Sequence, residues 1–216
     1  MNNNKTVQVW DLWVRLFHWS LVAMFVVAYF TAEEENIVHI YSGYAVLGLI
    51  SFRIIWGFIG TRYARFSDFI YPPQQVIQYI RGLMSGKPEH YLGHNPLGGW
   101  MVVALLAGLF VVTVSGLKLY AVEEGRGPLA RVEHPMFIDN AYADRDEDEA
   151  EEHERNKQGK GEKDQEEFWE ELHEISTNIT LFLIGLHILG VIVSSRMHKE
   201  NLIKAMITGN KEKKVC

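Results

Sequence analysis

Four uncharged stretches limit the fold of this chain more than any other sequence feature. Residues 16–32, 36–52, 95–117 and 175–195 contain no Asp, Glu, Lys or Arg. A helix that crosses a hydrocarbon layer about 30 Å thick needs roughly 20 mostly apolar residues at about 1.5 Å per residue. The two shorter stretches have apolar neighbours, VWDLWV before the first and IIWGFIG after the second. All four stretches are therefore long enough to span a membrane.

The four stretches predict an all-α membrane protein in which four transmembrane helices form an up-and-down bundle. We expect these helices near residues 13–32, 37–60, 97–120 and 169–195. Two shorter amphipathic segments, YPPQQVIQYIRGLMSG and HKENLIKAMITG, predict short helices that lie along the membrane surface. We interpret residues 1–216 as a single membrane domain.

The connection between the third and fourth spans is long and acidic. Its densest part reads DNAYADRDEDEAEEHERNKQGKGEKDQEE and has too little apolar surface to form a core. Residues 123–167 are therefore expected to form an extramembrane loop. The main interpretation is a solvated linker, and the alternative is a docking surface for a basic partner.

Lys and Arg are distributed unequally among the connections. The turn at 33–36 reads EEEN, whereas the 61–96 connection and the tail after residue 195 are rich in basic residues. Connections on the cytoplasmic side carry the excess of Lys and Arg. Both termini are therefore expected in the cytoplasm, with the acidic connection on the outer side.

The cysteine content excludes several kinds of redox site. Cys216 is the only cysteine in the chain, so no disulfide can form within it. No Cys-x-x-Cys-His motif is present to attach a haem covalently, and no thiolate cluster can bind zinc or an iron–sulfur centre. A redox centre in this chain needs other ligands.

Four histidines sort into two depths across the predicted bundle. His18 lies toward the cytoplasmic end of the first span, and His39 begins the second span after the outer turn. His173 lies near the outer end of the fourth span, and His187 follows fourteen residues later. That separation is about 21 Å along a helix axis at about 1.5 Å per residue. The inner depth therefore pairs His18 with His187, and the outer depth pairs His39 with His173.

The helical direction of these histidines supports the same pairing. Fourteen residues return a helix to within about 40° of the starting direction, so His173 and His187 share one face. A polar group inside a bilayer faces the bundle interior and has a partner there. Pairs of imidazoles on facing helices suit a haem iron, which takes one nitrogen on each side. Because both axial positions are then filled, the pattern predicts electron transfer rather than oxygen chemistry at the iron.

Three further residues fit a haem site. Gly43 lies one turn after His39, where a missing side chain would let a flat macrocycle approach, although close helix packing explains it equally well. Arg53 shares the face of His39 at the inner depth, and Arg15 lies one turn before His18. Both arginines are candidates to pair with a haem propionate, and snorkelling to the interface is the alternative for Arg53. The remaining histidines are expected to be solvated surface residues: His90, His94, His134, His153 and His198.

The chain resembles the bacterial cytochrome b561 family and the related b-type cytochrome subunits of nickel–iron hydrogenases. The resemblance runs from VWDLWVRLFHW through HIYSGYAVLGLISFRIIWGFIG and GHNPLGGWMVVALLAGLFVVTVSG to LHILGVIVSSRMHKENLIKAMITG. It implies a multi-pass protein of the bacterial inner membrane with two non-covalent haem b groups, each held by two histidines. By position, the resemblance assigns His18 and His187 to one haem, and His39 and His173 to the other.

The resemblance also implies a function, the exchange of electrons between the quinone pool and another redox protein. The acidic connection would steer a basic partner, and the first class to expect is a periplasmic c-type cytochrome. Three alternatives stay open: a haem-containing membrane anchor subunit of a larger oxidoreductase such as a hydrogenase, a superoxide:quinone oxidoreductase, and a metal or proton transporter. The last would need carboxylates inside the spans, which hold almost none. We assign no catalytic residue and expect no nucleic-acid partner, and the sequence leaves homodimer formation open.

Overall fold

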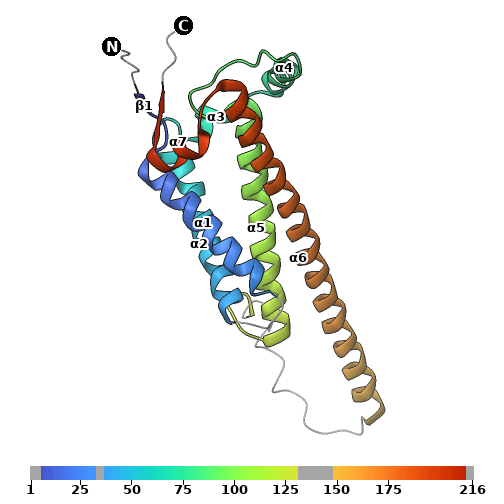
Figure 1. The fold of residues 1–216 in the computed structure, drawn as a ribbon. Helices are drawn as coiled ribbons and strands as arrows, with labels where there is room; N and C mark the ends of the chain where they lie inside the picture. Colours follow the sequence, from blue (N-terminus) through green and yellow to red (C-terminus); the bar gives the residue numbers. More distant parts are fainter. Residues whose placement is uncertain (1–5, 33–36, 131–147, 213–216) are drawn as a thin grey trace, which may run out of the picture. The chain divides into compact units, whose positions relative to one another are not determined.

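The computed structural model describes the backbone of residues 6–32, 37–130 and 148–212, and the side chains of these ranges except those of 148–162 and 212. Within the described residues, four helices are long and apolar enough to cross a membrane. They confirm the prediction of an all-α membrane protein with four spans. Figure 1 shows the helices and a small pair of strands.

The elements follow one another in a simple order. Strand β1 (Thr6–Gln8) precedes the first two spans, α1 (Leu12–Phe30) and α2 (Ile37–Ile59). Two short helices follow, α3 (Phe66–Phe69) and α4 (Pro73–Met84). The other two spans lie in α5 (Pro96–Glu124) and α6 (Asp148–His198), and the chain continues through α7 (Leu202–Thr208) and β2 (Asn210–Glu212).

Short polar residues determine where several helices begin. The Asp11 carboxylate accepts a hydrogen bond from the Val14 amide at 2.8 Å and caps α1. The Asn95 side chain accepts one from the Gly98 amide at 2.7 Å, and Pro96 then occupies the first position of α5. Gly209 ends α7 with a φ of 84°, in the left-handed region that glycine adopts without strain. These hydrogen bonds hold Asp11 and Asn95 against the first turns of α1 and α5.

The chain divides into two compact parts. The first part comprises residues 1–110 and 179–216, and the second comprises residues 111–178. In the first part α1 and α2 lie side by side (Figure 1). One cluster of buried residues joins α1, α2 and α5: Phe17, Val46, Ile50, Leu106 and Leu109. A second cluster joins the start of α1 to α7 and the α2–α3 connection: Val9, Trp10, Val14, Ala64 and Ala205.

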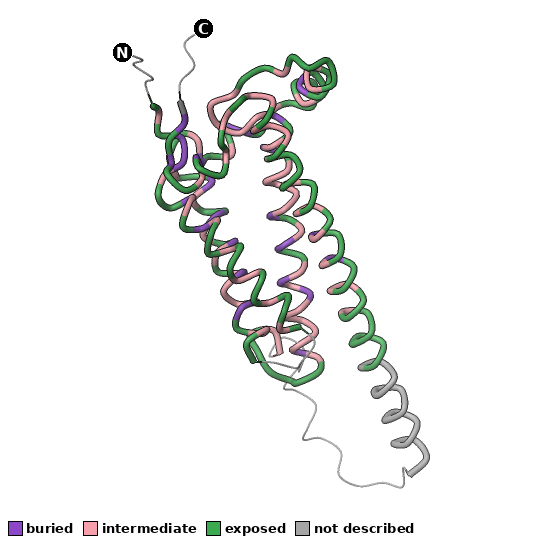
Figure 2. The backbone as a smooth tube through the Cα atoms, viewed as in Figure 1, coloured by how far each residue is buried: buried purple, intermediate pink, exposed green. Residues whose placement is uncertain are grey.

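Much of the surface of the spans is apolar and exposed. Figure 2 shows buried positions as short patches between exposed and partly exposed ones along each span. Phe30, Phe58 and Phe182 are 78%, 70% and 66% exposed. Large apolar side chains on the outer surface of a spanning helix face lipid rather than water. This surface agrees with a multi-pass membrane protein.

The strand pair was not predicted from the sequence. Residues Thr6, Val7 and Gln8 pair antiparallel with Glu212, Lys211 and Asn210. Strands of three residues are too short to show an alternating pattern, which explains the omission. The pairing brings the segment before α1 next to the segment after α7.

The prediction that residues 123–167 form a loop was wrong at both of its ends. Helix α5 continues to Glu124, and α6 begins at Asp148 rather than near residue 169. Glu, Lys, Gln and Arg are good helix formers, and a helix that already exists extends without a new nucleation cost. The apolar pattern therefore predicted the membrane-spanning part of α6 but not the polar turns of the same helix that precede it. The described residues do not include 131–147, so His134 and that section of the loop lie outside them, as does the side chain of His153.

The two short amphipathic helices are confirmed as helices. They are α4 and α7, and both belong to the first compact part. On α4, Ile77, Ile80 and Met84 are 49%, 36% and 85% exposed. Their location along the membrane surface remains a prediction.

Candidate functional site

His39 lies against the end of α1 and has a defined tautomer. Its Nδ1 atom is 2.9 Å from the carbonyl oxygen of Ala28. Ala28 is in the last turn of α1, where carbonyls lack partners within the helix. Because a carbonyl can only accept a hydrogen bond, Nδ1 carries the proton and the ring lone pair is on Nε2. Histidines that bind a metal commonly have this arrangement, with the second nitrogen held by a carbonyl.

His173 in the second compact part has the same arrangement. Its Nδ1 atom is 2.9 Å from the carbonyl oxygen of Val112 and 3.2 Å from the Ser115 hydroxyl. Ser115 itself donates to the Val112 carbonyl at 3.0 Å. The ring lone pair of His173 is therefore also on Nε2. His39 belongs to the first part and His173 to the second, so their pairing stays a prediction.

A glycine lets α5 approach the His173 ring. A Cβ atom at Gly116 would lie 2.9 Å from the Cε1 atom of His173 and 3.1 Å from its Nδ1 atom. Both distances are shorter than an ordinary van der Waals contact. Gly116 is therefore required for the observed orientation of the imidazole, and its sequence signal is weak because glycines are common in membrane helices.

The inner pair, His18 and His187, is brought together within the first compact part. The two side chains are close enough for their charges to interact. The Nδ1 atom of His18 is buried and has no hydrogen-bond partner among the described residues. The edge of the His18 ring faces Trp19, with 5.1 Å between the ring centroids. A buried ring nitrogen without a partner is unusual and indicates a site for an additional group.

Arg53 is a buried cation on the face of α2 that His39 also occupies. Its residue exposure is 2%, and its guanidinium carbon lies 5.3 Å from the Phe66 ring centroid and 5.7 Å from that of Phe69. Its Nη1 atom has no hydrogen-bond partner in the part of the chain that the structure describes. Cation–π contacts only partly replace the hydration of a guanidinium, so this location favours a bound anion.

Arg15 has a structural partner in α7. Its Nη1 atom donates to the Ile207 carbonyl at 2.6 Å, in the last turn of that helix. The Nε atom is buried and has no hydrogen-bond partner among the residues that the structure describes, and a Cβ at Gly209 would lie 3.4 Å from the guanidinium carbon. Arg15 thus joins α1 to α7, while its Nε atom leaves one donor for another group.

The surroundings of Gly43 agree with clearance for a cofactor. A Cβ atom added to Gly43 would meet nothing within 4 Å. Close packing of a neighbouring helix would place atoms near that point, and the described residues place none there. The same holds at Gly48, Gly185 and Gly190, so cofactor clearance at Gly43 stays a prediction.

His94 was predicted to be a solvated surface residue, and this prediction was wrong. Its ring centroid lies 4.6 Å from that of Trp10 and 4.7 Å from that of Phe69. Its Nδ1 atom is buried without a hydrogen-bond partner within the described ranges. Burial, followed by the positive charges of Arg53 and Lys211, lowers the pKa of His94 to about 3, so the imidazole is neutral at pH 7.

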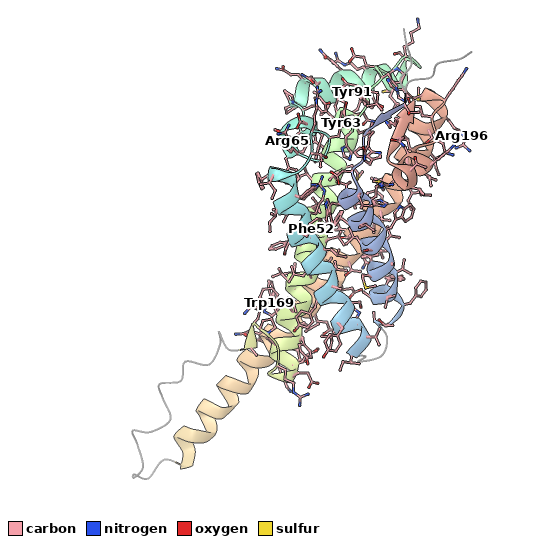
Figure 3. All side chains as sticks on the ribbon, turned by 90° about the vertical axis from the view of Figure 1, so that its left-hand side faces the viewer. Phe52, Tyr63, Arg65, Tyr91, Trp169 and Arg196 are labelled. Atoms are coloured by element: carbon pink, nitrogen blue, oxygen red, sulfur yellow. The ribbon has the colours of Figure 1, made fainter. Side chains whose placement is uncertain are left out.

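A sequence signal for this burial was present. Asn95 and Pro96 begin α5, so His94 directly precedes a helix and is not in the middle of a long connection. Gly93 lets the segment before α5 approach Tyr63 closely, because a Cβ atom at Gly93 would lie 3.0 Å from the Tyr63 ring. Figure 3 shows Tyr63 and Tyr91 at the same end of the first compact part.

A polar cluster holds the segments around β2 together. Glu200 accepts a hydrogen bond from His90, and its other carboxylate oxygen lies 3.5 Å from the Lys211 ammonium. Burial alone would raise the pKa of Glu200, but the hydrogen bond from His90 and the charge of Lys211 leave that pKa lowered. His198 contacts the Ser194 and Glu89 carbonyls at 3.1 and 3.3 Å. His90 and His198 are thus partners in the fold rather than only solvated residues.

Comparison with known proteins gives a family and three relatives. The model of the family described as prokaryotic cytochrome b561 matches residues 9–209. A "probable Ni/Fe-hydrogenase B-type cytochrome subunit" of Azotobacter chroococcum mcd 1 is 29% identical, over 60% of this chain and 66% of the relative. Proteins of the same description from Azotobacter vinelandii and Bradyrhizobium diazoefficiens are 29% and 28% identical, over 58% and 61% of this chain. The chain spans 64% to 66% of the length of these relatives. No solved structure matches it.

Proposed function

The chain belongs to the prokaryotic cytochrome b561 family, and we propose that it is a two-haem b-type cytochrome of the bacterial inner membrane. In this proposal it carries electrons between membrane quinone and a redox protein on the outer side. When bound between two imidazoles, haem iron exchanges single electrons and has no open position for oxygen. The chain's own residues hold and orient the two groups.

The observation that carries this proposal is the matched pair of Nδ1 bonds. His39 donates to Ala28 and His173 donates to Val112, each at 2.9 Å. Both bonds direct the Nε2 lone pair away from the carbonyl, as an axial ligand requires. Two membrane histidines with the same tautomer, each held by a neighbouring helix, are hard to explain as ordinary polar packing.

The other residues of the site fit haem in their chemistry. His18 and His187 would hold one group, the inner haem, although Nδ1 of His18, unlike that of His39 and His173, has no partner among the described residues. Arg53 offers a guanidinium with an unpartnered Nη1 atom to a propionate, and Gly43 offers clearance. His39 and His173 would hold the second group, the outer haem, and this pairing is supported by the sequence depth alone.

The orientation and the partner are proposed from charge. Basic residues in the 61–96 connection and after residue 195 favour a cytoplasmic location for both termini. The acidic residues of 139–167 would then face the periplasm and favour a basic partner, for which a c-type cytochrome is the expected class. A second candidate function is a membrane anchor subunit for a larger oxidoreductase, because the relatives are described as hydrogenase subunits.

Haem content and ligand variants test the proposal. Purified protein should give two haems per chain in a pyridine haemochrome assay, with the absorption of low-spin b-type haem. His18→Ala and His187→Ala should each remove the same haem, and His39→Ala and His173→Ala the other. His90→Ala is the matched control and should keep both. A single haem, or loss of one and the same haem from His18→Ala and His173→Ala, would contradict the assignment.

Affinity purification from native membranes separates the two candidate functions. Recovery of a small c-type cytochrome supports the electron carrier between quinone and a periplasmic protein. Recovery of a large metal-containing enzyme in a fixed ratio supports the anchor subunit. The experiment uses detergent at low ionic strength, because an encounter driven by the acidic segment weakens with salt.

A further inference from the structure

Two buried polar atoms in the first compact part have no hydrogen-bond partner among the described residues. They are Nη1 of Arg53, on α2, and Nδ1 of His94, directly before α5. Both side chains contact the same ring, with Phe69 5.7 Å from the guanidinium carbon and 4.7 Å from the imidazole centroid. The charge of Arg53 also reaches His94. Two unsatisfied groups on separate elements therefore lie beside one aromatic ring.

No described carboxylate accepts a hydrogen bond from Nη1 of Arg53 or Nδ1 of His94. Asp11 is the carboxylate whose charge Arg53 senses, but its oxygens already accept from the Val14 amide, Trp56 and Thr61. The other acidic residues near this end are occupied in the same way. Asp68 pairs with Arg65 at 3.0 Å, and Glu200 pairs with His90 and Lys211. The group that satisfies Arg53 and His94 must come from outside these segments.

Aromatic packing does not explain His94. Contacts with Trp10 and Phe69 account for a partly buried ring, and phenylalanine would make them without a polar atom. An imidazole nitrogen buried without a partner costs desolvation free energy that phenylalanine would avoid. The residue is therefore explained better by a hydrogen bond that it donates to a bound group than by its packing.

We infer that His94 is a positioning residue that, together with Arg53, binds a single carboxylate group, the propionate of the inner haem. This inference rests on the proposed function. Arg53 supplies the charge, and His94 in its Nδ1–H tautomer supplies a second, neutral donor. The location agrees, because His94 and the two ligands proposed for the inner haem, His18 and His187, belong to the same compact part. The second donor fixes the direction of the propionate, which a guanidinium alone does not.

The midpoint potential of the inner haem tests the inference. The negative charge of a propionate favours ferric iron, and each donor reduces that charge. His94→Phe keeps the ring packing but removes the donor, so the inner haem should be stabilised in the ferric form. A tenfold preference corresponds to a fall of about 60 mV for one electron. Haem release should become about tenfold faster, as is usual when a supporting hydrogen bond is lost.

A rescue variant and a control make the result specific. His94→Asn returns an N–H close to the former Nδ1 and should recover most of the potential and the slow haem release. His90→Phe, in the same connection, should leave both haems unchanged. The potential of the outer haem should stay constant in every variant. In a double-mutant cycle, Arg53→Lys and His94→Phe should be non-additive, because both act on one carboxylate.

Blocking the propionates identifies the bound group directly. In protein reconstituted with the dimethyl ester of iron protoporphyrin, the midpoint potential of the inner haem should be the same with and without the His94→Phe substitution. The inference is overturned if wild-type protein has two bis-histidine haems and His94→Phe leaves both potentials unchanged. It is also overturned if His94→Phe raises only the KM for a quinol, which would assign the donor to quinone. Absence of haem from the wild-type protein would instead refute the proposed function.

Discussion

Gly116→Ala is the substitution whose effect the structure defines most closely. The added Cβ would lie 2.9 Å from Cε1 and 3.1 Å from Nδ1 of His173. Ordinary contact begins near 3.4 Å, so the imidazole must withdraw by about half an ångström or the helices must separate. The Nδ1 bond to Val112, now 2.9 Å long, would then leave the normal range for a hydrogen bond.

The magnitude follows from these two effects. A strained contact in a packed interior costs about 1–3 kcal/mol, and a lost hydrogen bond costs about 0.5–1.5 kcal/mol. If these two effects together weaken binding through His173 by about 2 kcal/mol, the outer haem should bind roughly thirtyfold more weakly. The inner haem should be unaffected, because Gly116 and His173 belong to the second compact part and His18 and His187 to the first.

Haem transfer to an acceptor protein measures this loss. The release rate of each haem is followed by its absorption after addition of excess apomyoglobin to wild-type and variant protein. Gly48→Ala is the matched control in a spanning helix, because Gly48 is exposed on the face of α2 opposite His39 and a Cβ there would meet nothing within 4 Å among the described residues. Equal release from Gly116→Ala and Gly48→Ala would refute the view that the His173–Val112 bond supports the ligand.

Three further predictions concern stability and local order. The pKa of Glu200 is lowered in the folded state, so the Glu200 carboxylate stabilises the fold above pH 4.5, its ordinary pKa, and this stabilisation is lost as the pH falls through the lowered pKa. The unfolding temperature of Glu200→Gln in detergent should therefore depend less on pH below 4.5 than that of the wild-type protein. The same pH profile for both proteins would contradict this prediction. Asp11→Ala removes the cap of α1 and the partners of Trp56 and Thr61, so it should destabilise the fold by about 1–2 kcal/mol or more in a thermal melt, whereas Asn in its place should recover the cap. Arg15→Met removes the bond to the Ile207 carbonyl and should speed hydrogen exchange at the amides of α7 while those of α4 keep their rates.

Some of the fold could be predicted because lipid leaves a strong pattern in the sequence. The spans are defined by absent charge, and the ends predicted for the second span, 37 and 60, differ from the observed Ile37–Ile59 by one residue. The start of α6 was missed because a helix that continues into water needs favourable propensity but no apolar residues. The strand pair was missed because its partners are separated by almost the whole chain.

The candidate site also contains residues that spacing in the sequence predicts and residues that only the structure reveals. Depth and helical direction selected His18, His39, His173 and His187 as candidates, since both follow from residue spacing alone. His94 could not be found in this way, because its burial depends on Trp10 and Phe69, which come from other parts of the chain. Gly116 was missed for a related reason, as only the structure shows which of many glycines faces an imidazole.

The pairing of β1 with β2 has a consequence for how the protein is made. Residues Thr6–Gln8 leave the ribosome long before their partners Asn210–Glu212, so this contact can form only after all four spans have been synthesised. The same holds for Trp10 and Val14, whose buried cluster includes Ala205. Closure of the pair therefore follows synthesis of the last span, and a chain that stops before α7 would leave Val9, Trp10 and Val14 without the cover of Ala205.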